Sequence, residues 1–116
     1  MHKTVEQYIA MGCDRKTAEY YADGRKKIIQ VLADDDFTLL LTFDNGEIRR
    51  FDLKPMLDKG GVFVKLRQLE HFRRVYLDDC NCVSWDLDPD VDSSIVWNNK
   101  VDLCADSCYI DSIPVA

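Results

Sequence analysis

Residues 37–53, FTLLLTFDNGEIRRFDL, predict a β-hairpin. Phenylalanine and leucine occupy every second position of residues 37–43, which is the pattern of a half-buried strand. Asn45-Gly46 then favours a type I′ turn, because such a turn requires positive φ at both central residues. The returning strand is residues 48–53. With a two-residue turn its second arginine would face a core leucine, so we expect a bulge near Arg49-Arg50.

Helical and strand patterns continue on both sides of this hairpin. Thr4 and Asp14 are placed to cap two short helices, which end at Gly12 and Gly24. The later segments are a strand at 28–33, a helical turn at 54–57, a helical stretch at 63–72 with apolar residues at every third position, and a hairpin at about 75–85.

The sequence therefore predicts one α+β protein in two parts. Residues 1–27 form an N-terminal helical hairpin. Residues 28–112 form a small, mostly antiparallel sheet, with hairpins at about 37–53 and 75–85 and one or two short helices packed on it.

The length and composition indicate a single folded unit. A chain of 116 residues buries about two-thirds of its unfolded surface, and 47% hydrophobic residues are enough for a core. The longest run of large apolar side chains, residues 39–41, is far too short to span a membrane. The first residues lack the apolar stretch of a secretory signal. We therefore expect a cytoplasmic protein without a membrane partner.

Charge is distributed unevenly along the chain. Residues 1–30 carry six basic and four acidic residues, residues 31–77 carry eight of each, and residues 78–116 carry nine aspartates against one lysine. A nucleic-acid binder needs a basic face that displaces counterions from phosphate, so nucleic acid is not the expected partner. The acidic last third instead favours a basic protein.

Four alternating aspartates mark this acidic region: Asp86, Asp88, Asp90 and Asp92. Their spacing is similar to that of a calcium-binding loop, which needs glycine at its sixth position and glutamate at its twelfth. Counted from Asp86, those positions hold valine and tryptophan. We interpret the segment as a solvated acidic loop and its four aspartates as candidate partner-binding residues.

Five cysteines without an export signal predict free thiols in a reducing compartment. Cys80, Cys82, Cys104 and Cys108 raise the question of zinc, which binds four convergent thiolates or imidazoles. Neither pair has the usual two-residue spacer, and no histidine lies nearby. We expect no metal and no cofactor, and these four cysteines are the candidates should a metal bind.

Catalytic motifs are missing from the sequence. No nucleophile elbow accompanies His71, and Gly60-Gly61 lacks the Gly-Lys-Ser/Thr of a phosphate-binding loop. We therefore expect a protein that is not an enzyme.

Several short motifs occur in a characteristic order. They are the hairpin at 37–47, Phe51-Asp52-Leu53, Val62-Phe63 with Leu66, Phe72 with Val75, Val83-Ser84-Trp85, and Val101-Asp102-Leu103-Cys104 through Asp106 to Tyr109. This order resembles the bacterial domain-of-unknown-function family 2442 (DUF2442) over about residues 28–112. The N-terminal helices and an insertion at 86–100 depart from its shorter members. The shared positions, which turn geometry and core packing explain equally well, are Asn45, Gly46, Phe51, Phe63, Trp85, Asp102 and Tyr109.

The resemblance implies a small cytoplasmic α+β protein without an established catalytic activity. Some members are regarded as antitoxins because they are encoded beside a small toxin-like protein. Two hypotheses follow. The first is a protein-binding module, in its specific form an antitoxin, whose acidic surface meets a basic toxin-like protein encoded nearby. The second is a small-ligand or metal-binding module that uses the Cys/Asp-rich C-terminal segment. Open sheet edges also make a homodimer a reasonable expectation.

Overall fold

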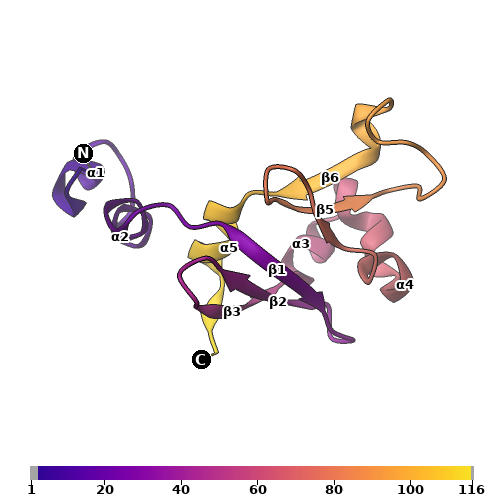
Figure 1. Ribbon diagram of the computed structural model, residues 1–116, viewed down its shortest axis with the longest axis horizontal. Coiled ribbons are helices and arrows are strands. Elements are labelled where there is room, and N and C mark those ends of the chain that lie inside the picture. Colours follow the sequence, from indigo (N-terminus) through magenta and orange to yellow (C-terminus); the bar gives the residue numbers. More distant parts are fainter. Residues whose placement is uncertain (1–2, 116) are drawn as a thin grey trace.

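The computed structural model describes residues 3–115 of the chain (Figure 1). The elements are, in order, α1 (Val5–Ala10), α2 (Arg15–Asp23), β1 (Ile28–Ala33), β2 (Thr38–Phe43), β3 (Ile48–Asp52), α3 (Lys54–Lys59), η1 (Gly61–Arg67), α4 (Leu69–Phe72), β4 (Tyr76–Leu77), β5 (Val83–Asp86), η2 (Trp97–Asn99), β6 (Lys100–Leu103), α5 (Ala105–Asp111) and β7 (Ile113–Pro114). The predicted α+β class is confirmed.

The two N-terminal helices stand to one side of the sheets (Figure 1). Thr4 and Gln7 form the predicted capping box at α1, and the Asp14 side chain accepts from the backbone N–H of Thr17 at the start of α2. An extended segment after Gly24, which has a φ of 105°, joins this helical hairpin to β1. The predicted hairpin is confirmed.

The first sheet has the strand order β1-β2-β3-β7, and its pairings are antiparallel. The turn between β2 and β3 has three residues rather than two, since the N–H of Phe43 donates to the carbonyl of Glu47. Gly46 has a φ of 87°, whereas Asn45 stays outside the positive-φ region. This is a type I turn followed by a left-handed glycine, so the type I′ prediction is wrong.

The three-residue turn also removes the need for the predicted bulge. Leu41 pairs with Arg49 and Leu39 with Phe51 in an unbroken register. Arg49 therefore points to the core side of the sheet, where it is buried. The bulge lies instead in β1, between Ile28 and Gln30.

The second hairpin, at about 75–85, is confirmed, but it belongs to a separate sheet of order β4-β5-β6. Residues 3–115 thus form two sheets where one was expected. The Asn81 side chain at the β4–β5 turn donates to the carbonyl of Ile28, which links the two sheets. In Figure 1 the second sheet and the loop that follows β5 lie at the far side from the N-terminal helices.

The core lies between the sheets and the helices of residues 54–72. The three-residue apolar spacing of the 63–72 stretch matches a 3₁₀ helix, η1, which is followed by the single turn α4. Trp85 is fully buried and donates its indole N–H to the carbonyl of Phe72. The largest fully buried side chains are Trp85, Phe43, Phe72, Ile28, Leu39, Leu41, Leu53 and Leu66.

The C-terminal elements α5 and β7 have no counterpart in the sequence-based prediction. The side chain of Cys104 caps α5 by accepting from the backbone N–H of Ser107, and β7 pairs with β3. Within residues 3–115, no helix is long and apolar enough to cross a membrane.

Candidate functional site

The loop between β5 and β6, residues 87–99 and hereafter the acidic loop, is held by a buried side chain. The amide of Asn99 donates to the carbonyls of Asp88 and Val91 and to the hydroxyl of Ser93. Its Oδ1 accepts from the N–H of Asp88. One asparagine therefore fixes the path of most of the loop from within.

The tip of the acidic loop exposes large apolar side chains. Trp97 is 83% exposed and Ile95 78% exposed, and Val96 between them is also exposed. Burial of such side chains is favourable, so a stable loop that keeps them in water is a candidate contact surface. This tip, Ile95 to Trp97, is the feature of the loop that the charge pattern did not reveal.

The four predicted partner-binding aspartates are not equivalent. Asp88, Asp90 and Asp92 are exposed, as a solvated loop requires. Asp86 is partly buried and accepts hydrogen bonds from the hydroxyls of Tyr76 and Ser93. The exposed acidic set beside the apolar tip is therefore Asp88, Asp90 and Asp92, while Asp86 holds the base of the loop.

Among the described residues, no three of the four candidate metal-binding cysteines lie close enough together to hold a metal ion. Cys82 and Cys104 flank the β5–β6 pairing at the end where Val83 meets Leu103, and Cys80 lies on the β4–β5 turn. Cys108 is fully buried, and burial raises its pKa to about 12, so its thiol stays protonated. All five cysteines are free.

A different group of possible ligands lies around Cys82. Ligand atoms of Asp78, Cys82 and Asp102 all lie within 4.8 Å of one another. The Asp78 carboxylate is already engaged, however. Its Oδ1 accepts from the backbone N–H groups of Cys80 and Cys82, and its Oδ2 accepts from the Lys100 ammonium at 2.5 Å. A cation here would have to displace Lys100.

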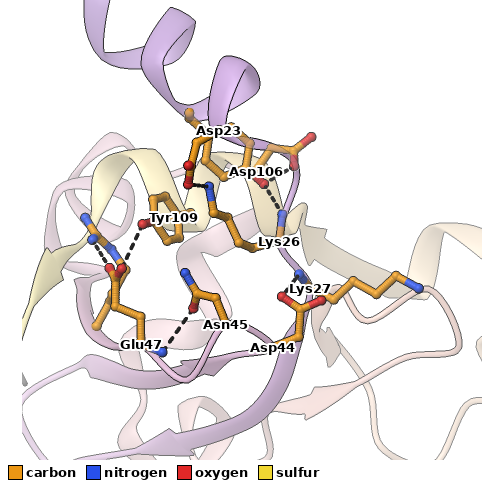
Figure 2. Close-up of polar contacts among 10 residues, drawn as sticks. Asp23, Lys26, Lys27, Asp44, Asn45, Glu47, Asp106 and Tyr109 are labelled. Carbon is orange, nitrogen blue, oxygen red and sulfur yellow. Dashed lines mark hydrogen bonds and ion pairs between the residues drawn. The ribbon is translucent and has the colours of Figure 1, made fainter. Parts of the chain in front are cut away.

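Polar side chains gather where α2 meets α5 and β3 (Figure 2). The buried hydroxyl of Tyr20 donates to Asp106 and accepts from the backbone N–H of Lys26. Arg25 forms an ion pair of 2.9 Å with the same carboxylate. Desolvation and the hydrogen bond to Asp106 raise the pKa of Tyr20 far above its usual value, so the phenol is neutral.

Two buried cations lie on the aromatic rings of this junction. The Lys26 ammonium is 4.8 Å from the ring centre of Tyr20 and 4.9 Å from that of Tyr109. The Arg49 guanidinium lies 4.2 Å from the Tyr109 ring centre. The Tyr109 hydroxyl donates to Glu47, which also pairs with Arg49. We call Tyr20, Lys26, Arg49, Asp106 and Tyr109 the junction cluster.

Comparison with protein families assigns the greater part of the chain to one family. Residues 28–110, from the first residue of β1 into α5, match the family model described as "Protein of unknown function (DUF2442)". The chain belongs to the DUF2442 family. No curated protein and no solved structure matches it.

The DUF2442 match places the family boundary inside the junction cluster. Arg49, Asp106 and Tyr109 lie in the matched region, whereas Tyr20 and Lys26 precede it. Helices α1 and α2 also precede it. The junction cluster is therefore where the N-terminal helices attach to the DUF2442 region.

The positions that the sequence resemblance predicts to be shared with the family have different roles here. Gly46 supplies the left-handed turn residue, Phe51 and Trp85 are in the core, and Phe63 packs against it. Asn45 is exposed and its side chain accepts from the N–H of Glu47. Two positions are not explained by packing alone, because Asp102 is exposed and Tyr109 belongs to the junction cluster.

Proposed function

We propose that this DUF2442 protein is a non-enzymatic protein-binding module, and that it binds its partner through the tip of the acidic loop. The observation that carries the proposal is the 83% exposure of Trp97, on a loop that Asn99 holds in place. Tryptophan is enriched among the residues that dominate binding energy at protein interfaces. A loop already fixed loses little conformational entropy when it binds.

The charge around the tip indicates the chemistry of the partner. Asp88, Asp90 and Asp92 are exposed carboxylates of the same loop, which carries no basic residue. A basic protein would be steered toward this surface, and an apolar pocket on that partner would then receive Trp97. In the specific form that we propose, the partner is a basic toxin-like protein encoded nearby, and this chain is its antitoxin.

The test uses the product of the neighbouring gene as the binding partner. Trp97→Ala should weaken binding by about 2 kcal/mol, or roughly 30-fold in Kd, measured by isothermal titration calorimetry. Ile113→Ser is the matched control, since Ile113 is a 70% exposed apolar residue on β7 of the first sheet. Equal Kd values for the wild type and Trp97→Ala would contradict the proposal. Equal losses of affinity in Trp97→Ala and Ile113→Ser would also contradict it.

A metal-binding module is the second candidate, and the grouping of Asp78, Cys82 and Asp102 favours it. A thiolate with two carboxylates would suit a borderline divalent cation such as Zn²⁺. Cys82→Ser separates the two functions. It should abolish a stoichiometric zinc site if one exists and leave binding of the protein partner unchanged.

A further inference from the structure

We propose that the cavity between α2 and α5 is a binding site for a small organic carboxylate, which replaces Asp23 as the partner of the Lys26 ammonium. The cavity has a volume of about 370 Å³, and Tyr20, Lys26, Arg49 and Tyr109 are among its lining residues. Small-molecule sites range from about 300 to 1,000 Å³ and combine apolar walls with a few polar groups. The volume of this cavity falls within that range, and its lining combines Tyr20, Tyr109 and Ile110 with five charged residues.

Two of the three cations that line the cavity are built into the fold. Lys26 is 7% exposed and Arg49 is 9% exposed. Arg49 is oriented by Ser112, whose hydroxyl accepts from Nε and whose carbonyl accepts from Nη2. A buried cation needs compensation from anions or π faces, and here the rings of Tyr20 and Tyr109 provide part of it.

The ammonium of Lys26 retains donor capacity. It has three N–H groups, and among the described residues a single oxygen, Oδ2 of Asp23 at 2.7 Å, accepts from it. The ammonium also lies over the rings of Tyr20 and Tyr109, and Figure 2 shows it beside Asp23. A carboxylate with two oxygens would use this capacity better than the single contact that Asp23 makes.

Asp23 is a replaceable partner. Its side chain is 75% exposed, so it can rotate into water without leaving a buried charge. It also lies in the last turn of α2, which contains no basic residue. A negative charge there is unfavourable for the helix dipole, so the contact with Lys26 is what holds Asp23 in place.

The cavity lining specifies the class of ligand. Three cations line it, and Arg49 among them is already paired with Glu47. Displacement of Asp23 leaves Lys16 and Lys26 against the single carboxylate of Glu19, which is a net positive charge. Tyr20 and Tyr109 offer ring surface for a planar or apolar body. The ligand is thus an anion with an apolar part, for which benzoate is the simplest probe.

The experiment titrates the full chain with sodium benzoate at constant ionic strength and follows amide chemical shifts by NMR. Benzylammonium chloride is the oppositely charged control of the same shape. Asp23→Asn removes the competing carboxylate and should tighten benzoate binding about fivefold. Lys26→Met should weaken it at least tenfold. Asp58→Asn, at an exposed carboxylate on α3, should leave the affinity unchanged.

The Asp23→Asn variant decides the question even if Lys26→Met fails to fold. Tighter benzoate binding in Asp23→Asn, with shifts at Lys26 and Tyr109, supports the site. Affinity equal to that of the wild type overturns it, because a purely structural ion pair would lose stability without gaining a ligand. Equal binding of benzylammonium and benzoate, or no saturable shift in either protein, also overturns it.

Discussion

The hydroxyl of Tyr20 donates a hydrogen bond of 2.5 Å to Oδ1 of Asp106, 86 positions further along the chain. Tyr20 is in α2, outside the region that matches DUF2442, and Asp106 is in α5, inside it. The bond is buried, and α2 meets the rest of the protein mainly through α5. The attachment of the N-terminal helices therefore includes this hydrogen bond, the ion pair of Arg25 with Asp106, and the contact between the rings of Tyr20 and Tyr109.

Tyr20→Phe should loosen this attachment. The variant loses the bond to Asp106 and leaves the N–H of Lys26 without its acceptor, so the free energy of unfolding should fall by about 1–3 kcal/mol. Urea denaturation measures this loss, and faster tryptic cleavage at 25–27 would show that the helices detach. Tyr21→Phe is the control, because its hydroxyl lies 3.4 Å from Asp106 and should matter less. Equal losses of stability in the two variants would contradict the role of the bond between Tyr20 and Asp106 in this attachment.

Gly46→Val should destabilise the first hairpin. A β-branched residue at a φ of 87° is strained, and the expected loss is about 1–2 kcal/mol in thermal or urea unfolding. Asn45→Ala should lose less, since it removes one side-chain hydrogen bond at a residue without positive φ. A neutral Gly46→Val variant would show that this turn tolerates another conformation.

Much of the fold could be predicted because its local signals are strong. Alternating apolar residues, Asn45-Gly46 and the Thr4 and Asp14 caps each act within a few residues. The register of β3 could not be predicted, since it depends on whether the turn contains two or three residues. Helix α5 was missed because Asp106, Ser107 and Tyr109 are weak helix formers, and tertiary contacts such as Tyr20 to Asp106 stabilise it.

The candidate sites were less accessible from the sequence. The aspartates of the acidic loop were visible as a charge pattern, but the exposure of Trp97 depends on the buried Asn99 that turns the loop. Lys26 and Tyr109 are 83 positions apart and carry no shared motif, so only the folded chain brings them together. For the loop tip, the sequence signal was Ile95 to Trp97, an apolar run inside a polar segment.

Stability should decrease in acid, partly through Asp78. Burial opposes ionisation of this carboxyl, but hydrogen bonds from Lys100 and from two backbone N–H groups outweigh it and lower its pKa below the usual 3.8. The contribution of Asp78 to the free energy of unfolding is therefore complete above about pH 4, where the carboxyl of the unfolded chain is also ionised. It is lost as the pH falls through the lower pKa of the folded state.

Asp78→Asn should remove this part of the pH dependence. Urea unfolding at pH 7 and pH 3 should show a smaller difference for Asp78→Asn than for the wild type. Asp79→Asn is the control, since Asp79 is the exposed neighbour of Asp78. A pH difference unchanged by Asp78→Asn would assign the acid sensitivity to other carboxylates, such as Glu47 beside Arg49.

The cysteines should react with thiol reagents in an order set by burial. Cys80 and Cys104 are exposed and should react first, Cys13 and Cys82 more slowly, and Cys108 only on unfolding. Mass spectrometry after timed labelling measures the order, and all five should react in denaturant without a reductant. Elemental analysis should find no stoichiometric zinc. One zinc per chain, with Cys82 protected until a chelator is added, would instead support the metal-binding candidate.

Neutralising the acidic loop should slow association with the basic partner. Asn keeps the oxygens of Asp88 and Asp92 that accept from the backbone N–H groups of Asp90 and Ser94, so the triple substitution to asparagine at Asp88, Asp90 and Asp92 should leave the loop folded. Exposed charges act mainly through steering, so at low salt the on-rate should fall about tenfold while the off-rate changes little.

The measurement is stopped-flow association with the neighbouring gene product across a salt series. The matched control removes three exposed carboxylates elsewhere, by Glu6→Gln, Asp36→Asn and Asp58→Asn, and so has the same net charge. Screening shortens the range of the interaction to about 8 Å at physiological salt, so the difference between the two triple variants should shrink as salt increases. If both variants slow association equally, only net charge matters, and the contact surface has to be sought away from the acidic loop.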